Sequence, residues 1–285
     1  MNGSRKYFHV YTKGLENYIV FQDREDYIAG MNYVATTAFS CSVDMLAFTL
    51  MSNHFHFALY ATEDEAKRFI NLYKQVISAY VRRKYGISQI LRYDQTSCKE
   101  IDLENEGLKK IIAYILNNPV KAGVNFLAQN YEWGSCRYYF SNIRFEEGVP
   151  VRSIGERRLR EILHSKVKLS ENYRLNSQGY IDPRSYLNVE FVERLFKRAS
   201  SMEYFLNIAG KSDKKDGPIS FNDSTVCMCL SEILEKQYDS VSVSQLPFSA
   251  RQRIVIYLKS KLGCQAKQIA RVTNLDIKDV FELLG

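Results

Sequence analysis

Two apolar runs joined by a short turn constrain most strongly what this chain can fold into. Residues 43–51 read VDMLAFTLM and predict a buried strand. Residues 52–53 predict a turn, and residues 54–60 (HFHFALY) predict the partner strand. A hairpin of this kind pairs its strands antiparallel, so the sequence predicts an antiparallel sheet.

Further elements are predicted on both sides of this hairpin. Residues 6–13 (KYFHVYTK) are rich in aromatic and β-branched side chains and predict a strand. Residues 23–39 predict a helix with Asp23 as its N-cap. Residues 62–85 open as TEDE, carry apolar side chains at helical spacing and are followed by Gly86, so they predict a second helix.

The order of the elements defines the predicted fold class. Residues 87–94 predict a short strand, and residues 104–118 predict a helix broken by Pro119. The resulting order, β-α-β-β-α-(β)-α, predicts an α+β fold: a ferredoxin-like antiparallel sheet with helices on one face.

The 285 residues allow one large domain or two to three small ones. Residues 1–145 form the predicted α+β domain. Residues 146–222 form a helical and loop-rich extension that ends in a charged linker containing Gly-Pro. Residues 223–285 form a predicted all-α region.

Composition excludes some classes of protein. No apolar run approaches the roughly 18 residues of a membrane-spanning helix, and the first residues lack the apolar core of a signal peptide. We therefore expect a cytoplasmic protein without a membrane partner, whose six cysteines are reduced thiols, mostly in the core. The net charge of +7 gives weak support for an anionic partner.

The chain has four histidines, and two of them form the motif His54-Phe55-His56. Alternation along a strand puts both imidazoles on one face, about 7 Å apart along the backbone, with Phe55 directed into the core. Two imidazoles from one strand supply half of a metal site. The alternative is a histidine pair on an exposed sheet face; the strongly apolar flanks weigh against it.

Tyr114 and Asn118 form a second candidate pair, one helical turn apart on the predicted helix. A tyrosine hydroxyl beside an amide oxygen is able to serve one metal site as nucleophile and ligand. The alternative, which spacing alone favours, is a core tyrosine and a helix-terminal Asn before Pro119. Tyr80 is the competing tyrosine, but it lies on an apolar stripe with Lys84 one turn later, so we expect it in the core.

Several segments, in this order, carry a family resemblance: YFHVYTKG, EDYIAGMNYV, the H-x-H motif, YILNNPVKAG and YEWGSCRYY. Over about residues 5–140 the chain resembles the HUH single-tyrosine transposases, specifically the REP-associated tyrosine transposases. The resemblance implies that His54 and His56 are metal ligands, that Tyr114 is the nucleophile and that Asn118 is a polar third ligand. Ser52 departs from the family by replacing a common Pro.

The resemblance implies cleavage and joining of single-stranded DNA near a hairpin. A divalent cation, Mg²⁺ or Mn²⁺, would polarise the scissile phosphate, and Mn²⁺ suits mixed imidazole–oxygen ligation better. Attack by Tyr114 would give a 5′-phosphotyrosine and a free 3′-OH. The energy of the cleaved bond is kept in this link, which agrees with the absence of a nucleotide-binding P-loop motif.

The C-terminal stretch 265–284 carries a further signal. Ala270, Asn274 and Val280 match the small, turn and apolar positions of a helix-turn-helix, and Asn tolerates a left-handed turn. The stretch resembles the DNA-binding end of replication initiators, which implies duplex DNA recognition with Lys278 facing a groove. The alternative is a small helical bundle for dimerisation or packing.

Basic side chains are expected to hold the DNA, although for each residue taken singly a solvated surface charge is the favoured interpretation. Two alternatives to a transposase stay open: a catalytically silent DNA-binding regulator, and a metal-dependent phosphodiesterase acting on RNA or nucleotides. The oligomeric state, monomer or homodimer, is open as well. The basic residues expected at DNA are Lys13, Arg82, Arg83, Lys109, Lys110, Lys121, Arg137 and Lys278.

Overall fold

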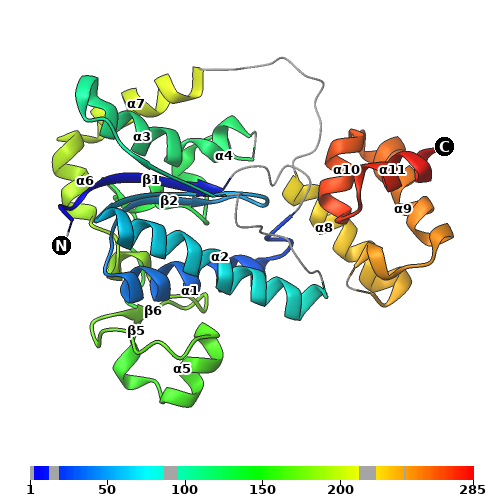
Figure 1. Ribbon diagram of the computed structural model, residues 1–285, viewed down its shortest axis with the longest axis horizontal. Helices are drawn as coiled ribbons and strands as arrows, with labels where there is room; N and C mark the ends of the chain where they lie inside the picture. The colour runs from blue at the N-terminus through cyan, green and yellow to red at the C-terminus, as the bar shows by residue number, and fades with distance from the viewer. Residues whose placement is uncertain (1–2, 13–18, 87–95, 123, 212–222, 241) are drawn as a thin grey trace.

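The centre of the molecule is a four-stranded antiparallel sheet with the strand order β2-β3-β1-β4 (Figure 1). The β2–β3 hairpin and the first strand are confirmed as predicted. The computed structural model describes residues 3–12, 19–86, 96–122, 124–211, 223–240 and 242–285. The strands are β1 (Lys6–Thr12), β2 (Asp44–Leu50), β3 (Phe55–Ala61) and β4 (Thr96–Glu100).

Helices α1 and α2 cover one face of the sheet (Figure 1). Each begins at a predicted capping residue: the side chains of Asp23 and Thr62 accept hydrogen bonds from the backbone three residues on, which completes a capping box. Gly86 ends α2 in the left-handed conformation, at φ 68°. The two helices span Arg24–Cys41 and Glu63–Tyr85.

The other face of the sheet is also covered, so the expectation of helices on one face only was wrong. Strands β2 and β3 bury almost every residue on both faces. Phe55 and Phe57 enter the core beneath α1 and α2, whereas Ala58 and Leu46 enter a second core formed with α3. Strands that are apolar on both faces need a layer of structure on each.

The predicted helix at 104–118 is divided. Helix α3 ends at Leu116, and Pro119 lies in the first turn of a new short helix, because proline fits where a backbone N–H has no partner. The predicted strand at 87–94 lies outside the described residues; the edge strand β4 follows it and is polar and partly exposed. A turn of 3₁₀ helix and the two helices span Glu104–Glu106, Gly107–Leu116 (α3) and Asn118–Lys121 (α4).

The extension after residue 145 packs on the sheet domain in two places. Helix α7 lies along α3, while α5, β5 and β6 form a small cluster against α1 (Figure 1). Buried Asn32 on α1 anchors this cluster, since its Nδ2 donates to the carbonyls of Ile162 and Gly179 and its Oδ1 accepts from the Ile181 N–H at 2.9 Å. The elements are β5 (Val149–Pro150), α5 (Glu156–Leu163), β6 (Arg174–Leu175), α6 (Val189–Phe196) and α7 (Ala199–Lys211).

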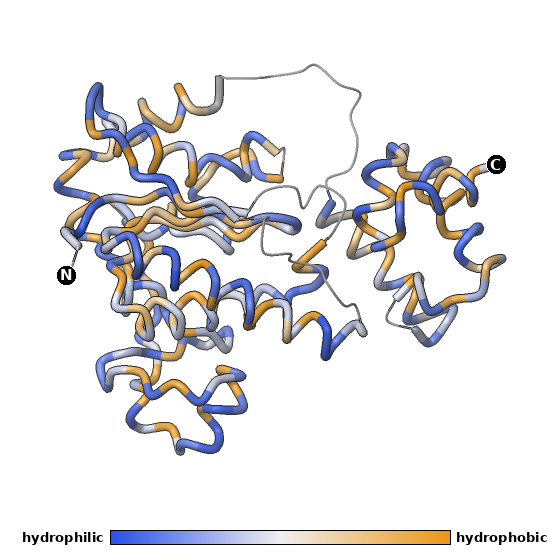
Figure 2. The backbone as a smooth tube through the Cα atoms, in the orientation of Figure 1, coloured by the Kyte–Doolittle hydropathy of each residue, from blue (hydrophilic) through white to orange (hydrophobic). Residues whose placement is uncertain are grey.

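The C-terminal helices form a core of their own, and hydrophobic segments alternate with hydrophilic ones along them (Figure 2). Ile19, which precedes α1, is fully buried in this core. Asn274 joins the last two helices in the predicted left-handed conformation, at φ 54°. The elements are α8 (Asp223–Ile233), a π-helical turn (Leu234–Tyr238), α9 (Phe248–Leu262), α10 (Ala266–Thr273) and α11 (Ile277–Leu284).

Two composition-based expectations can be compared with the structure. All six cysteines are free and four of them are buried, as expected. Within the described part of the chain, no helix has the length and apolar character needed to cross a membrane.

Short 3₁₀ turns complete the structure at Ala128–Asn130, Cys136–Tyr138, Val151–Ser153, Pro183–Ser185 and Val243–Gln245.

Candidate functional site

The two histidines of the H-x-H motif meet at the start of β3. The strand begins at Phe55, whose ring enters the core beneath α1 and α2 as predicted. His56 is buried on the opposite face, the α3 side. The rings of His54 and His56 lie edge to face with their centroids 5.2 Å apart. The first residues of β3 and the residue before it therefore hold two imidazoles next to each other at one end of the sheet.

The predicted helix pair lies against these rings. The Tyr114 ring packs edge-on against His56, with the centroids 5.6 Å apart. The Asn118 Nδ2 donates to the backbone carbonyls of Tyr114 at 2.8 Å and Ile115 at 3.4 Å. The amide oxygen of Asn118 is therefore the atom left for another partner, and Asn118 is close enough to His54 to act on the pKa of that imidazole. The four predicted residues thus lie together.

Two further side chains belong to this cluster, and the sequence did not single them out as site residues. His9 on β1 places its Nε2 3.0 Å from the Nδ1 of His56. Tyr11 lies directly opposite His56 in the β1–β3 register and stacks on its ring, with centroids 5.5 Å apart. The alternation in FHVY already predicts that His9 and Tyr11 lie on one face of their strand. Only the pairing register of β1 with β3 shows that this face is the one that carries His56.

The imidazoles are uncharged at neutral pH. Burial lowers the pKa of His54, and it lowers the pKa of His56 further with the help of His54 and His9. Burial, together with the charge of Lys99, lowers the pKa of His9 to about 4. An uncharged imidazole is the form that binds a metal ion.

The donor set fits a divalent cation of intermediate hardness. His54 Nδ1 lies 2.7 Å from Asn53 Oδ1, and because an amide oxygen only accepts, this contact leaves the lone pair on His54 Nε2. Among the residues that the structure describes, no three His, Cys, Asp or Glu side chains gather as a metal site. A cation would therefore depend on His54, His56 and the Asn118 amide oxygen, a mixed N/O set.

The predicted nucleophile is half-buried and protonated. Burial and the neighbouring Tyr11 raise the pKa of Tyr114. The Lys121 Nζ lies 4.9 Å from the centre of the Tyr114 ring, and Lys110 precedes Tyr114 by one turn of α3 and shares its face. Cations at these places counter the negative charge of a phenolate or a phosphate.

The other basic residues predicted to hold DNA lie apart from this cluster. Lys109 pairs with Glu106 at 2.7 Å. Arg82 and Arg83 are exposed on the last turn of α2, on the opposite face of the sheet. Arg137 lines a cavity of about 430 Å³ beside Phe145. Lys278 is exposed on α11, and Lys13 lies outside the described residues.

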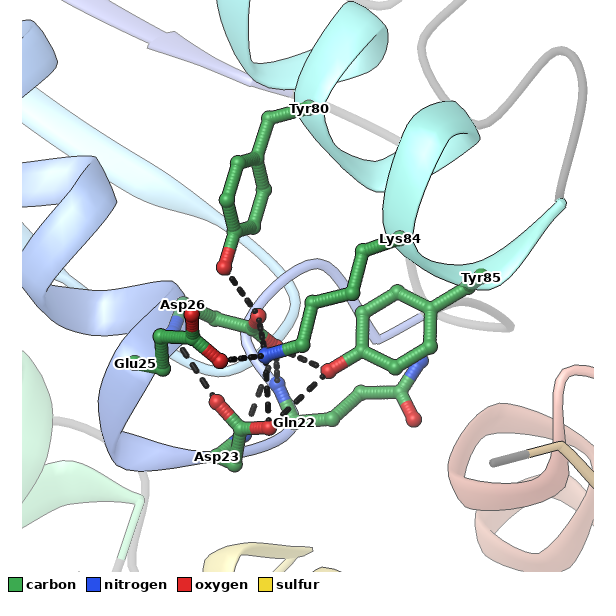
Figure 3. A network of polar contacts seen from close by, with 7 residues as sticks. All are labelled: Gln22, Asp23, Glu25, Asp26, Tyr80, Lys84 and Tyr85. Atoms are coloured by element: carbon green, nitrogen blue, oxygen red, sulfur yellow. Dashed lines mark hydrogen bonds and ion pairs between the residues drawn. The ribbon is translucent and has the colours of Figure 1, made fainter. Parts of the chain in front are cut away.

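Tyr80 is part of a different arrangement, as expected of a core residue. It is buried on α2 and donates to the Asp26 carboxylate at 3.0 Å (Figure 3). Lys84 Nζ lies within 3.0 Å of the carboxylates of Asp23, Glu25 and Asp26. This network joins the end of α2 to the start of α1, and the histidine beside it is His164, whose ring centroid lies 5.9 Å from that of Tyr80.

The C-terminal helices lie beside the same end of the sheet (Figure 1). The Asn274 Oδ1 accepts a hydrogen bond from the Ile19 N–H at 3.3 Å. Arg271 forms a largely buried ion pair with Asp223 at 2.6 Å, and the charge of Arg271 contributes to lowering the pKa of His54. The turn of the predicted helix-turn-helix is thus in contact with the segment before α1.

Comparisons with known proteins give one distant structural similarity. No protein-family model matches the chain, and no curated protein matches it. A solved structure described as a REP-associated tyrosine transposase bound to a REP hairpin superposes with a TM-score of 0.36 and 11% sequence identity. The similar region covers 48% of this chain and 79% of the other. An overlap at this level does not establish a family for this chain.

Proposed function

We propose that this protein is a metal-dependent enzyme that cleaves and joins single-stranded DNA at hairpins, with Tyr114 as its nucleophile. One observation carries the proposal: four side chains from the start of β3, from α3 and from α4 meet at one end of the sheet, where the ring centroids of Tyr114 and His56 are 5.6 Å apart. These side chains are His54, His56, Tyr114 and Asn118. A nucleophile beside a pair of uncharged imidazoles is the arrangement that metal-assisted phosphoryl transfer needs.

We also propose that the sheet domain is ferredoxin-like. The elements follow the order β1-α1-β2-β3-α2-β4, and the strands lie in the order β2-β3-β1-β4. Strand β1 thus lies between β3 and β4, antiparallel to both, which is the split β-α-β arrangement of that fold.

In the proposed reaction, the Tyr114 oxygen attacks phosphorus and loses its proton. The bond between phosphorus and this oxygen forms as the bond to the DNA 3′ oxygen breaks, and the 3′ oxygen takes up a proton. His54, His56 and Asn118 would hold Mn²⁺ or Mg²⁺, which polarises the phosphate when bound. A 3′-OH returning to the phosphotyrosine joins strands without ATP.

The DNA would lie across the α3–α4 side of the site. Lys110 and Lys121 flank Tyr114 there and are exposed, so they are placed to neutralise phosphates on either side of the scissile bond. The C-terminal helices adjoin this end of the sheet, and we propose that they contact the duplex part of the hairpin.

A covalent-trapping assay tests the proposal. Labelled hairpin oligonucleotides with a single-stranded flank are incubated with protein and Mn²⁺ or Mg²⁺, and adducts are resolved on denaturing gels. We expect a metal-dependent adduct that Tyr114→Phe and His56→Ala abolish. Tyr80→Phe is the matched control, because it removes the hydroxyl of the competing tyrosine, which donates to Asp26 on the opposite side of the sheet, and the adduct should persist in it.

The other outcomes each favour a different function. An adduct that survives Tyr114→Phe would refute the assignment of the nucleophile. Hairpin binding without an adduct would favour a silent DNA-binding regulator. Metal-dependent cleavage without an adduct would favour a phosphodiesterase, since simple hydrolysis leaves no covalent intermediate.

A further inference from the structure

We infer that His9 is a positioning residue that orients His56 as a metal ligand by accepting a hydrogen bond from the Nδ1–H of His56. This inference rests on the proposed metal site. The observation behind it is the 3.0 Å contact between His9 Nε2 and His56 Nδ1, made across the β1–β3 pairing. Metal-binding histidines commonly donate their second N–H to a partner that fixes the ring.

The direction of this hydrogen bond decides which nitrogen of His56 is available to a cation. If Nδ1 of His56 carries the proton and donates it to His9, the lone pair of His56 is on Nε2. His54 has the same arrangement, with its Nδ1 on Asn53 Oδ1 at 2.7 Å and its lone pair on Nε2. Both imidazoles then present the same atom to one cation. The opposite tautomer of His56 would carry a proton on Nε2 and bind none.

Packing holds His9 in place for this role. Its side chain is 8% exposed, and its ring stacks on Tyr11 with centroids 4.6 Å apart and on His56 with centroids 5.2 Å apart. The neighbours Phe8 and Val10 are buried on the other face of the sheet, in the core beneath α1 and α2. A ring enclosed on this side has little freedom to turn away, so the orientation of His56 is fixed before a cation arrives.

Metal binding provides the first test. Mn²⁺ is titrated into the protein, and the free ion is followed by its EPR signal. We expect His56→Ala to abolish binding and His9→Leu to weaken it roughly 10- to 100-fold, as loss of an orienting partner does. His9→Gln, which restores an acceptor, should recover part of the affinity. His164→Asn is the matched control: it removes a distant imidazole from a left-handed position that Asn tolerates, and affinity should not change.

The second test determines the tautomer of His56 in the unmodified protein and therefore requires no variant. Long-range ¹⁵N–¹H spectra should show the Nδ1–H form, and the Nε2–H form would overturn the inference. Unchanged Mn²⁺ affinity in folded His9→Leu, with binding lost in His56→Ala, would also overturn it while leaving the proposed metal site intact. No Mn²⁺ binding by the unmodified protein would refute that metal site and the role of His9 in it.

Discussion

Replacing Lys84 by Met should destabilise the protein strongly, because Lys84 is the cation at the centre of three carboxylates. Its Nζ lies 2.7 Å from Asp23, 3.0 Å from Glu25 and 2.8 Å from Asp26 (Figure 3). The Asp26 side chain is fully buried. Methionine keeps most of the volume of the lysine stem and removes the charge, so the substitution isolates the electrostatic contribution.

The expected loss in the free energy of unfolding is about 3 kcal/mol near neutral pH. Removing one partner of a buried ion pair costs roughly 3–5 kcal/mol, since it leaves a charge without compensation. The lower end applies here for two reasons. Asp26 keeps hydrogen bonds from two backbone N–H groups and from the hydroxyls of Tyr80 and Tyr85. Asp23 and Glu25 are 41% and 70% exposed, so water screens them.

The loss should depend on pH in a defined direction. Burial, with the charge of Asp23, raises the pKa of Asp26 in the native protein, and Lys84 opposes this shift. Without Lys84 the native pKa of Asp26 rises further above its unfolded value of about 4. Between the unfolded and the native pKa of Asp26, the native variant binds more protons than the unfolded chain. Its free energy of unfolding is therefore higher at low pH and falls as the pH rises.

Urea unfolding followed by the fluorescence of Trp133, the single tryptophan, measures this effect. The difference between the unmodified protein and Lys84→Met should be larger at about pH 8 than at about pH 5. Lys67→Met is the control: it breaks the pair that Lys67 makes with Glu63 on the exposed side of the same helix, and the urea midpoint should not move. A loss below about 1 kcal/mol at about pH 8, or one that does not shrink at the lower pH, would refute this reasoning.

Three further predictions concern packing, capping and DNA binding. Gly30→Ala should cost about 1–3 kcal/mol in urea unfolding, because its Cβ would lie 2.6 Å from the Phe21 ring, whereas Gly155→Ala, with open space around it, should not. Thr62→Ala should cost about 1 kcal/mol by removing the N-cap of α2; an unchanged urea midpoint would contradict this. Lys121→Gln should weaken hairpin binding in fluorescence anisotropy and lower its salt dependence by roughly one counterion; an unchanged slope would place Lys121 away from the phosphates.

The elements with strong local signals were the ones that the sequence predicted well. Asp23 and Thr62 begin their helices because their side chains cap backbone N–H groups, an interaction contained within four residues. Edge strand β4 (TSCKE) gave no such signal, because this short, half-exposed strand lacks apolar alternation and has Thr96 as its single β-branched side chain. The second layer of helices was missed for another reason. The apolar runs of β2 and β3 show that both faces are buried, but not which later helices bury them.

The candidate site shows the same division between local and distant information. The spacing of His54 with His56, and of Tyr114 with Asn118, was enough to predict that the two members of each pair lie close together, although His54 precedes β3 and Asn118 begins α4. That the two pairs meet depends on how α3 packs on the sheet, which no spacing contains. His9 was missed as a member of the site because its role depends on a cross-strand register.

The segments that carry the candidate site residues meet because each of them has one end at the same end of the sheet. Because β1 and β3 are antiparallel, the end of β1 lies beside the start of β3, which brings His9 to His56. The end of β2 lies there too, and the Thr49 hydroxyl donates to the carbonyl of Ile115 at 2.8 Å. That bond ties the last turn of α3 to the sheet at the residue after Tyr114. Tyr114 is therefore held over the histidines by a hydrogen bond from the sheet itself, which keeps the proposed nucleophile and the proposed metal ligands in register.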